Sequence, residues 1–132
     1  MTENGLITLP SAHGAKVTAD RLAAEVAAKG MTVFARIDHA AGAKEVGMAL
    51  RPTEVLIFGN ARGGTPLMQA KQTIGIDLPL KALIWEDADG KVWLTYNDPA
   101  WIAQRHGATG VTEVTSRLAA ALAALAKTAT GA

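Results

Sequence analysis

The strongest constraint on the fold is the segment from Leu80 to Asn97, which alternates apolar and polar residues on both sides of a turn at Ala88-Asp89-Gly90. Such alternation is typical of strands that bury one face. A three-residue loop with Gly90 in the left-handed region pairs Asp87 with Lys91. The segment therefore predicts a β-hairpin, and with it an antiparallel sheet.

The register of this hairpin decides which side chains share a face. Counting back from the loop pairs Ala82 with Tyr96, Ile84 with Leu94, and Trp85 with Trp93. The even-numbered face is then an apolar core, and the odd-numbered face carries both tryptophans. A two-residue turn would shift the register by one and separate the tryptophans. We expect a second subunit or the C-terminal helix to cover the odd-numbered face, because an exposed apolar patch of that size is unusual.

Flanking patterns predict the remaining elements of a single domain over residues 1–132. Further strands are predicted over residues 5–9, 31–37 and 54–58, the second with Met31, Val33, Ala35 and Ile37 on one face. Helices are predicted after an N-cap at Thr18, over 38–50, over 66–74, from Asp98-Pro99, and over 111–128, with "KTATGA" as a frayed tail. The result is an α+β fold.

Composition excludes several classes of function. The 132-residue chain has a net charge of +1 and no cluster of lysine or arginine, which argues against nucleic-acid binding. Cysteine is absent, which excludes disulfides, thiol catalysis and zinc–thiolate sites. Neither a signal peptide nor an apolar run of about 20 residues is present. We expect a soluble cytoplasmic protein that does not enter the membrane.

A glycine-rich stretch, "IFGNARGGTPLMQ", has two interpretations. Gly59 and Gly64 have the spacing of a phosphate-binding loop, but Thr65 and Pro66 stand where that loop needs lysine and a hydroxyl. We therefore reject nucleotide hydrolysis. Free N–H groups, together with Arg62 and Thr65, are suited to holding a small anion. Alternatively, the glycines only permit a tight turn, with Thr65 as a cap and Pro66 in the first helical position.

Titratable residues give one candidate for chemistry. The three histidines, His13, His39 and His106, lack metal-ligand spacing, and we expect neither a metal nor a cofactor. His106 is expected to interact with a helix dipole. His39 follows a strand end and is the best titratable candidate. The acidic run Glu86 to Asp89 is interpreted as a solvated turn.

Four motifs in order resemble the family called domain of unknown function DUF302. They are "IDHAAGA", "FGNARGGTPLM", "IDLPLKALIWED" and "TYNDP", within about residues 33–99. Ala61 departs from the family pattern, in which asparagine and proline commonly precede the glycine turn. The resemblance implies a mainly antiparallel sheet of about five strands with helices on one face, and a dimer. It places His39, Asn60, Gly64, Thr65, Pro66, Asn97 and Asp98 at family-typical positions. It implies no reaction.

The leading hypothesis is a dimeric binding module for a small polar or anionic ligand. Its pocket would form where three polar segments meet at strand ends, and this requires His39 to lie within about 15 Å of Thr65. The candidate ligand-binding residues are His39, Asn60, Arg62, Gly64, Thr65, Tyr96, Asn97 and Asp98.

Two alternatives stay open. The first is an enzyme that uses His39 as a general base, which requires a cleft and an orienting partner for the imidazole. The second is an interaction module whose working surface is the sheet face that carries Trp85 and Trp93.

Overall fold

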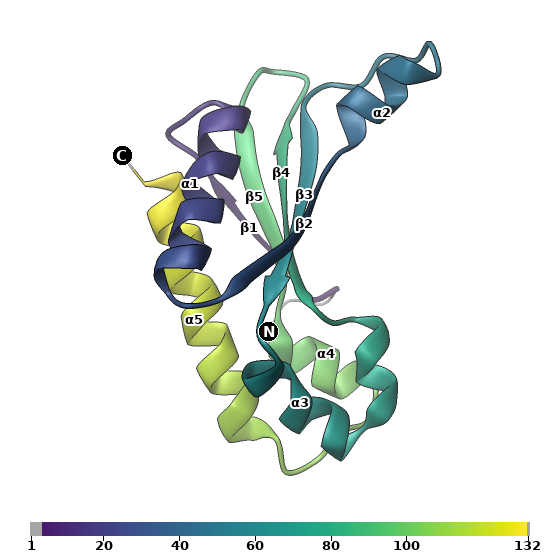
Figure 1. Ribbon diagram of the computed structural model, residues 1–132, viewed down its shortest axis with the longest axis vertical. Coiled ribbons are helices and arrows are strands. Elements are labelled where there is room, and N and C mark those ends of the chain that lie inside the picture. The colour runs from purple at the N-terminus through teal and green to yellow at the C-terminus, as the bar shows by residue number, and fades with distance from the viewer. Residues whose placement is uncertain (1–3, 132) are drawn as a thin grey trace.

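Five antiparallel strands form one open sheet in the order β1-β5-β4-β3-β2 (Figure 1). The computed structural model describes residues 4–131. The strands are β1 (Leu6–Pro10), β2 (Thr32–Asp38), β3 (Thr53–Gly59), β4 (Leu80–Glu86) and β5 (Val92–Asn97). The helices are α1 (Ala15–Ala28), α2 (His39–Glu45), α3 (Ala61–Ala70), α4 (Pro99–Arg105) and α5 (Thr112–Thr130), with a 3₁₀ turn η1 (Gln72–Ile76). The predicted α+β fold is confirmed.

The β4–β5 hairpin has the predicted register. Its pairs include Ala82 with Tyr96, Ile84 with Leu94, and Trp85 with Trp93. Gly90 has a φ of 82°, and the Asp87 N–H donates to the Lys91 carbonyl at 2.8 Å.

Both tryptophans of the hairpin are tied to their neighbours. The indole rings of Trp85 and Trp93 stack with centroids 6.2 Å apart. Trp93 Nε1 donates to the Asp87 carboxylate at 2.9 Å, and this bond is the main cause that lowers the pKa of Asp87.

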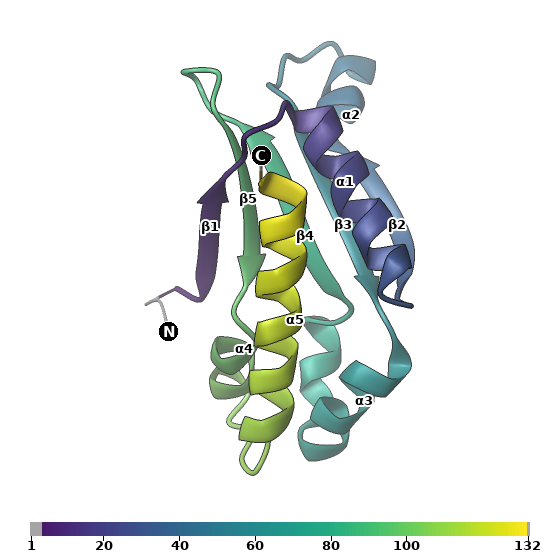
Figure 2. The same cartoon turned by 90° about the vertical axis from the view of Figure 1, so that its left-hand side faces the viewer.

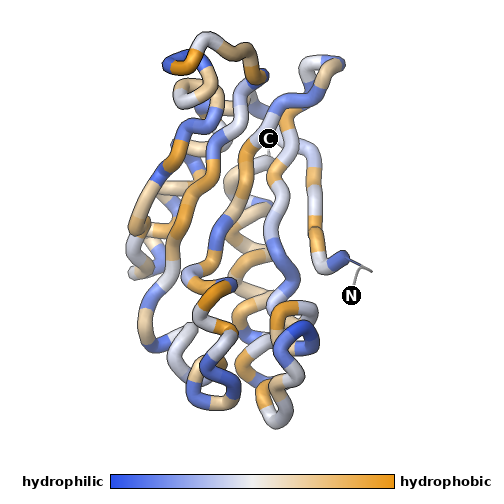
Figure 3. The backbone as a smooth tube through the Cα atoms, turned by 90° about the vertical axis from the view of Figure 1, so that its right-hand side faces the viewer, coloured by the Kyte–Doolittle hydropathy of each residue, from blue (hydrophilic) through white to orange (hydrophobic). Residues whose placement is uncertain are grey.

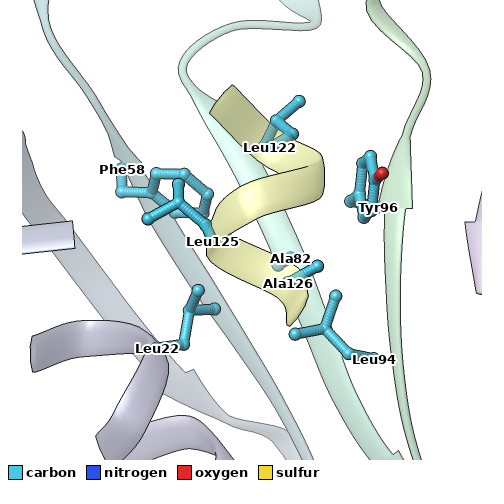
Figure 4. A pocket seen from close by; sticks show the side chains of 8 residues that line it. All are labelled: Leu22, Phe58, Ala82, Leu94, Tyr96, Leu122, Leu125 and Ala126. Atoms are coloured by element: carbon cyan, nitrogen blue, oxygen red, sulfur yellow. The ribbon is translucent and has the colours of Figure 1, made fainter. Parts of the chain in front are cut away.

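The core lies between the even-numbered face and two helices, α1 and α5, which run side by side over the sheet (Figure 2). Phe58 from β3 meets Leu22 from α1 and Leu125 from α5 (Figure 4). The space among these side chains holds no cavity that admits a water molecule (≈ 0 Å³). The residues are closely packed, as a stable interior requires.

The face of the sheet that carries Trp85 and Trp93 lies on the side away from α1 and α5 (Figures 1 and 3). The expectation that the C-terminal helix covers it is wrong, because α5 packs on the other face. The strand registers place sixteen residues on this face: Leu6, Thr8, Pro10, Thr32, Ala35, Ile37, Thr53, Val55, Ile57, Gly59, Lys81, Leu83, Trp85, Trp93, Thr95 and Asn97. We call this set the open sheet face.

Strand β2 departs from the predicted alternation. Its register shifts between Val33 and Ala35, so that Val33 pairs with Phe58 on the core side while Ala35 pairs with Ile57 on the open sheet face. The predicted common face for Val33 and Ala35 is therefore wrong. A bulge inserts one extra residue and moves the following side chains to the other face.

Helix α1 begins one turn earlier than predicted. Gly14 precedes its first residue, and Thr18 lies inside the helix, fully buried. The Thr18 hydroxyl donates to the Gly14 carbonyl at 2.8 Å and shares a hydrogen bond with the Ser11 hydroxyl at 2.6 Å. Because these two bonds to residues before the helix satisfy the hydroxyl, Thr18 can be buried inside α1.

Helices α2 and α5 also differ from their predicted lengths. Helix α2 ends at Glu45, because Gly47 turns the chain with a φ of 75°. Helix α5 continues to Thr130, so the prediction of a frayed tail from Lys127 is wrong for the described residues. Arg21 binds the carbonyls of Thr128, Ala129 and Gly131 and thereby holds the helix end against α1.

Candidate functional site

A groove of about 770 Å³ lies between the start of α3, the exposed side of α5, and the junction of α1 with β2. Figure 2 shows these elements around the lower part of α5. Residues from Gly59 to Gly64 form one wall, and a row from Val114 to Leu125 forms the opposite wall. Its volume lies within the range of small-ligand sites, about 300–1,000 Å³.

The charged residues of the groove are all cations. Among residues 4–131, Lys29, Arg62 and Arg117 line it, no aspartate or glutamate does, and Asn60 supplies the one side-chain amide. Arg117 and Lys29 also form exposed pairs with Glu113 and Glu25, at 3.1 and 3.6 Å. Such exposed pairs contribute little to stability, so these cations remain available to an anion.

The first turn of α3 adds backbone donors to this wall. The helix begins at Ala61 rather than Pro66, and Asn60 rather than Thr65 caps it by accepting the Gly63 N–H at 2.7 Å. The prediction of Thr65-Pro66 as the helix start is wrong, because Asn60 offers an equally good cap five residues earlier.

The N–H groups of Ala61 and Arg62 have no partner within the helix, as at every helix start. Arg62 makes no side-chain hydrogen bond or ion pair within residues 4–131. Backbone and side-chain donors of one segment therefore lie together at the groove.

Close packing explains two of the glycines in this segment. A Cβ added at Gly63 would lie 3.2 Å from the capping Asn60 oxygen, and one at Gly64 would lie 3.2 Å from Leu78. Both contacts are tighter than ordinary van der Waals separation. The absence of a side chain at Gly63 thus leaves room for the Asn60 cap, and its absence at Gly64 leaves room for Leu78 in the wall of the groove.

All predicted site residues except His39 lie at one end of the sheet, in two groups. Asn60, Arg62 and Gly64 line the groove, whereas the neighbouring Thr65 is exposed and does not. The other group, Tyr96, Asn97 and Asp98, lies at the end of β5. There Asp98 caps α4 by accepting the Ala100 N–H at 3.0 Å, as predicted.

The other two residues of the β5 group lie outside the groove. Tyr96 is buried in the core, and burial, followed by the charge of Asp98, raises the pKa of its hydroxyl. Asn97 belongs to the open sheet face. The expected meeting of these three residues with the α3 segment in one pocket is not observed.

His39 lies at the opposite end of the sheet. It follows Asp38, which pairs with Glu54, whereas Asn60 follows Gly59, which pairs with Thr32. The five residue-to-residue steps from Glu54 to Gly59 span roughly 17 Å along the strand. The expected pocket shared by His39 and Thr65 is therefore not formed.

The environment of His39 also lacks what a general base needs. The side chain is exposed at the start of α2 and has no hydrogen bond or ion pair within residues 4–131. A base must be oriented by a second group near its substrate. Neither requirement of the His39 hypothesis is met.

Sequence reasoning missed the residues that complete the groove. Lys29 and Arg117 are separated from Arg62 by 33 and 55 positions, and no local pattern connects them. One signal was available in α5, where small alanines at 120, 121 and 124 lie beside the larger apolar residues Leu118, Leu122 and Leu125. These exposed alanines line the groove.

A second polar cluster joins η1 to the end of α4. His106 donates through Nε2 to Asp77 at 2.5 Å, and its Nδ1 shares a hydrogen bond with the Thr73 hydroxyl at 2.9 Å. Arg105 also binds both oxygens of Asp77. None of these side chains lines the groove. Besides ending α4, His106 therefore ties two segments together.

Comparison with known proteins is consistent with this fold. A crystal structure of an uncharacterized conserved DUF302 protein from Bacillus stearothermophilus superposes with a TM-score of 0.85, covering 95% of this chain and 98% of that one. At 17% identity, this likeness shows the fold alone.

Curated relatives carry a different name. Fluoride-specific ion channel FluC 1 of Brucella suis biovar 1 (strain 1330) and of Brucella abortus biovar 1 (strain 9-941) are each 60% identical over 104 residues. The match covers 79% of this chain but only 41% and 38% of theirs, so the chain spans about two-fifths of their length. Within residues 4–131, no helix is long and apolar enough to cross a bilayer.

The family comparison also covers most of the chain. The family described as domain of unknown function DUF302 matches residues 7–125, which include the sheet, the groove and most of α5. This range extends the resemblance of the four motifs to nearly the whole chain. The chain belongs to the DUF302 family.

Proposed function

We propose that this protein is a binding module whose groove between α3 and α5 holds a small anionic ligand. The observation that carries the proposal is the lining of the groove, to which the described part of the chain contributes three cations, one amide and no carboxylate. An anion at the start of α3 gains from the helix dipole and from the free N–H groups of Ala61 and Arg62. A cytoplasmic location stays a prediction of the sequence.

Arg62 is the side chain on which binding should depend most. It is the lining cation that has no carboxylate partner within residues 4–131. Hydrogen bonds to charged groups contribute about 1.5–3 kcal/mol. We expect Arg62→Gln to weaken anion binding by about tenfold or more, measured by calorimetric titration with a panel of phosphate, acetate and longer carboxylates.

Lys71→Gln is the matched control for this variant. It removes one positive charge from the exposed residue that ends α3, outside the groove. It should leave affinity nearly unchanged. Equal affinities of wild type and Arg62→Gln for every anion that binds would contradict the assignment of this groove.

Fluoride belongs in the panel because the Brucella relatives are named as fluoride-specific ion channels. The geometry favours a larger ligand. Fluoride is small and strongly hydrated, whereas the groove measures about 770 Å³ and is lined mostly by apolar side chains. We therefore expect fluoride to bind more weakly than a carboxylate of larger size.

We also propose that two copies associate through the open sheet face. Of its sixteen residues only Lys81 is charged, and the face presents Trp85, Trp93 and Leu83 together. A nearly neutral face meets a second copy of itself without repulsion between like charges. It has no cluster of cations that would attract nucleic acid or an anionic membrane.

Leu83→Lys tests this dimer. Leu83 lies on the central strand β4, and in a symmetric interface each copy would bury one added charge at this position. We expect the variant to sediment as a monomer at concentrations where the wild type is a dimer. Val17→Lys, at a position 49% exposed on α1, is the control and should remain dimeric. A monomeric wild type would contradict the proposal.

A further inference from the structure

We infer that the ligand of the groove is amphipathic, with an anionic head and an unbranched apolar chain, such as a medium-chain carboxylate. This inference rests on the proposed function and specifies its ligand class. It follows from the distribution of charge, the length of the groove and its volume.

Charge and apolar surface are separated within the groove. The side chains of Lys29 and Arg117 are 58% and 72% exposed, and Arg62 is exposed too, so the cations stand at the rim. The interior is formed by apolar side chains, among them Met31, Met68, Leu78, Leu80 and Leu125. A small hydrated anion would satisfy the rim alone. A ligand with an apolar chain would also cover the interior, and the two methionines adapt readily to such a chain.

The shape of the groove suits a narrow molecule. Its wall on α5 extends from Val114 to Leu125, which is roughly 16 Å at 1.5 Å per residue. A helical peptide of that length and about 10 Å across would fill roughly 1,200 Å³. The groove offers about 770 Å³. An extended acyl chain therefore matches the groove better than a helix from another protein does.

The chain should lie against the exposed alanines of α5. Ala121 lines the groove, whereas Ala123 is also exposed on the same helix and does not line it. Ala121→Phe and Ala123→Phe thus introduce the same side chain into the same helix, once inside the groove and once outside. Thermal unfolding of both variants verifies that they fold.

The experiment is a calorimetric titration of the full chain with decanoate, acetate and decanol, with decanoate kept below its micelle concentration. We expect the wild type to bind decanoate at least tenfold more tightly than acetate or decanol. Ala121→Phe should weaken decanoate binding at least tenfold and leave acetate binding within twofold. Ala123→Phe should change neither affinity.

The possible failures are distinguishable. Equal affinity for acetate and decanoate, lost in Arg62→Gln, would overturn the amphipathic ligand and leave the anion site standing. Decanol binding as tightly as decanoate would overturn the requirement for an anionic head, and with it the proposed function. Absence of binding by every anion tested would overturn both. The comparison of ligands needs only the wild type, so an unstable variant does not weaken it.

Discussion

Phe58→Ala is expected to lower the free energy of unfolding by about 3–5 kcal/mol, the usual cost of removing a buried phenylalanine side chain. Phe58 is 0% exposed and lies where β3, α1 and α5 meet. The surrounding side chains leave no cavity, so the lost ring would create one in a closely packed region. Because the free energy of unfolding of native proteins is only about 5–15 kcal/mol, a loss of this size should bring the variant close to unfolding.

Urea unfolding followed by circular dichroism measures this difference. The chain contains one other phenylalanine, Phe34, which is 55% exposed in β2. Phe34→Ala should change stability by about 0.5 kcal/mol or less, as is usual for surface substitutions. Similar effects of the two variants would show that the core is not where the structure places it.

Gly5→Ala is expected to destabilise the protein by about 2–4 kcal/mol, from a strained backbone and a steric clash together. Gly5 has a φ of 77°, and an added Cβ would lie 2.3 Å from Cδ2 of Trp101. The Gly5 carbonyl also accepts the Asp98 N–H at 2.8 Å, next to the start of α4. Moving Gly5 to relieve the clash would therefore disturb this junction.

Gly30→Ala separates the two contributions. Gly30 has nearly the same φ, 78°, but an added Cβ would meet no atom of residues 4–131 within 4 Å. Its cost should be about 1 kcal/mol, the penalty of the left-handed backbone alone. Thermal or urea unfolding of both variants gives the difference. If Gly5→Ala cost no more than Gly30→Ala, the contact with Trp101 would be contradicted.

The hairpin could be predicted because its information is local. Alternation over Leu80 to Asn97 and a glycine in the turn are sufficient to set the register, which the structure confirms. The start of α3 could not be chosen in this way, because Asn60 and Thr65 are both good caps. The end of α5 depends on Arg21, which lies more than 100 residues away in the chain.

The wrong prediction that His39 lies near Thr65 has a simple physical reason. Neighbouring antiparallel strands run in opposite directions and finish at opposite ends of the sheet. The residue after β2 therefore cannot lie beside the residue after β3. Strands β3 and β5 run in the same direction, which explains why Asn60 and Asp98 lie at one end. The groove itself depends on three cations from distant segments, and only the packing of α5 against α1 and α3 brings them together.

The most direct test of the groove is a set of backbone amide chemical shifts recorded by NMR during a titration with decanoate. The shifts should change for Ala61 to Gly64 and along the row from Val114 to Leu125, which line the groove. They should stay constant around His39, at the other end of the sheet. Changes confined to other surfaces, or shifts that do not respond to any anion, would contradict the account.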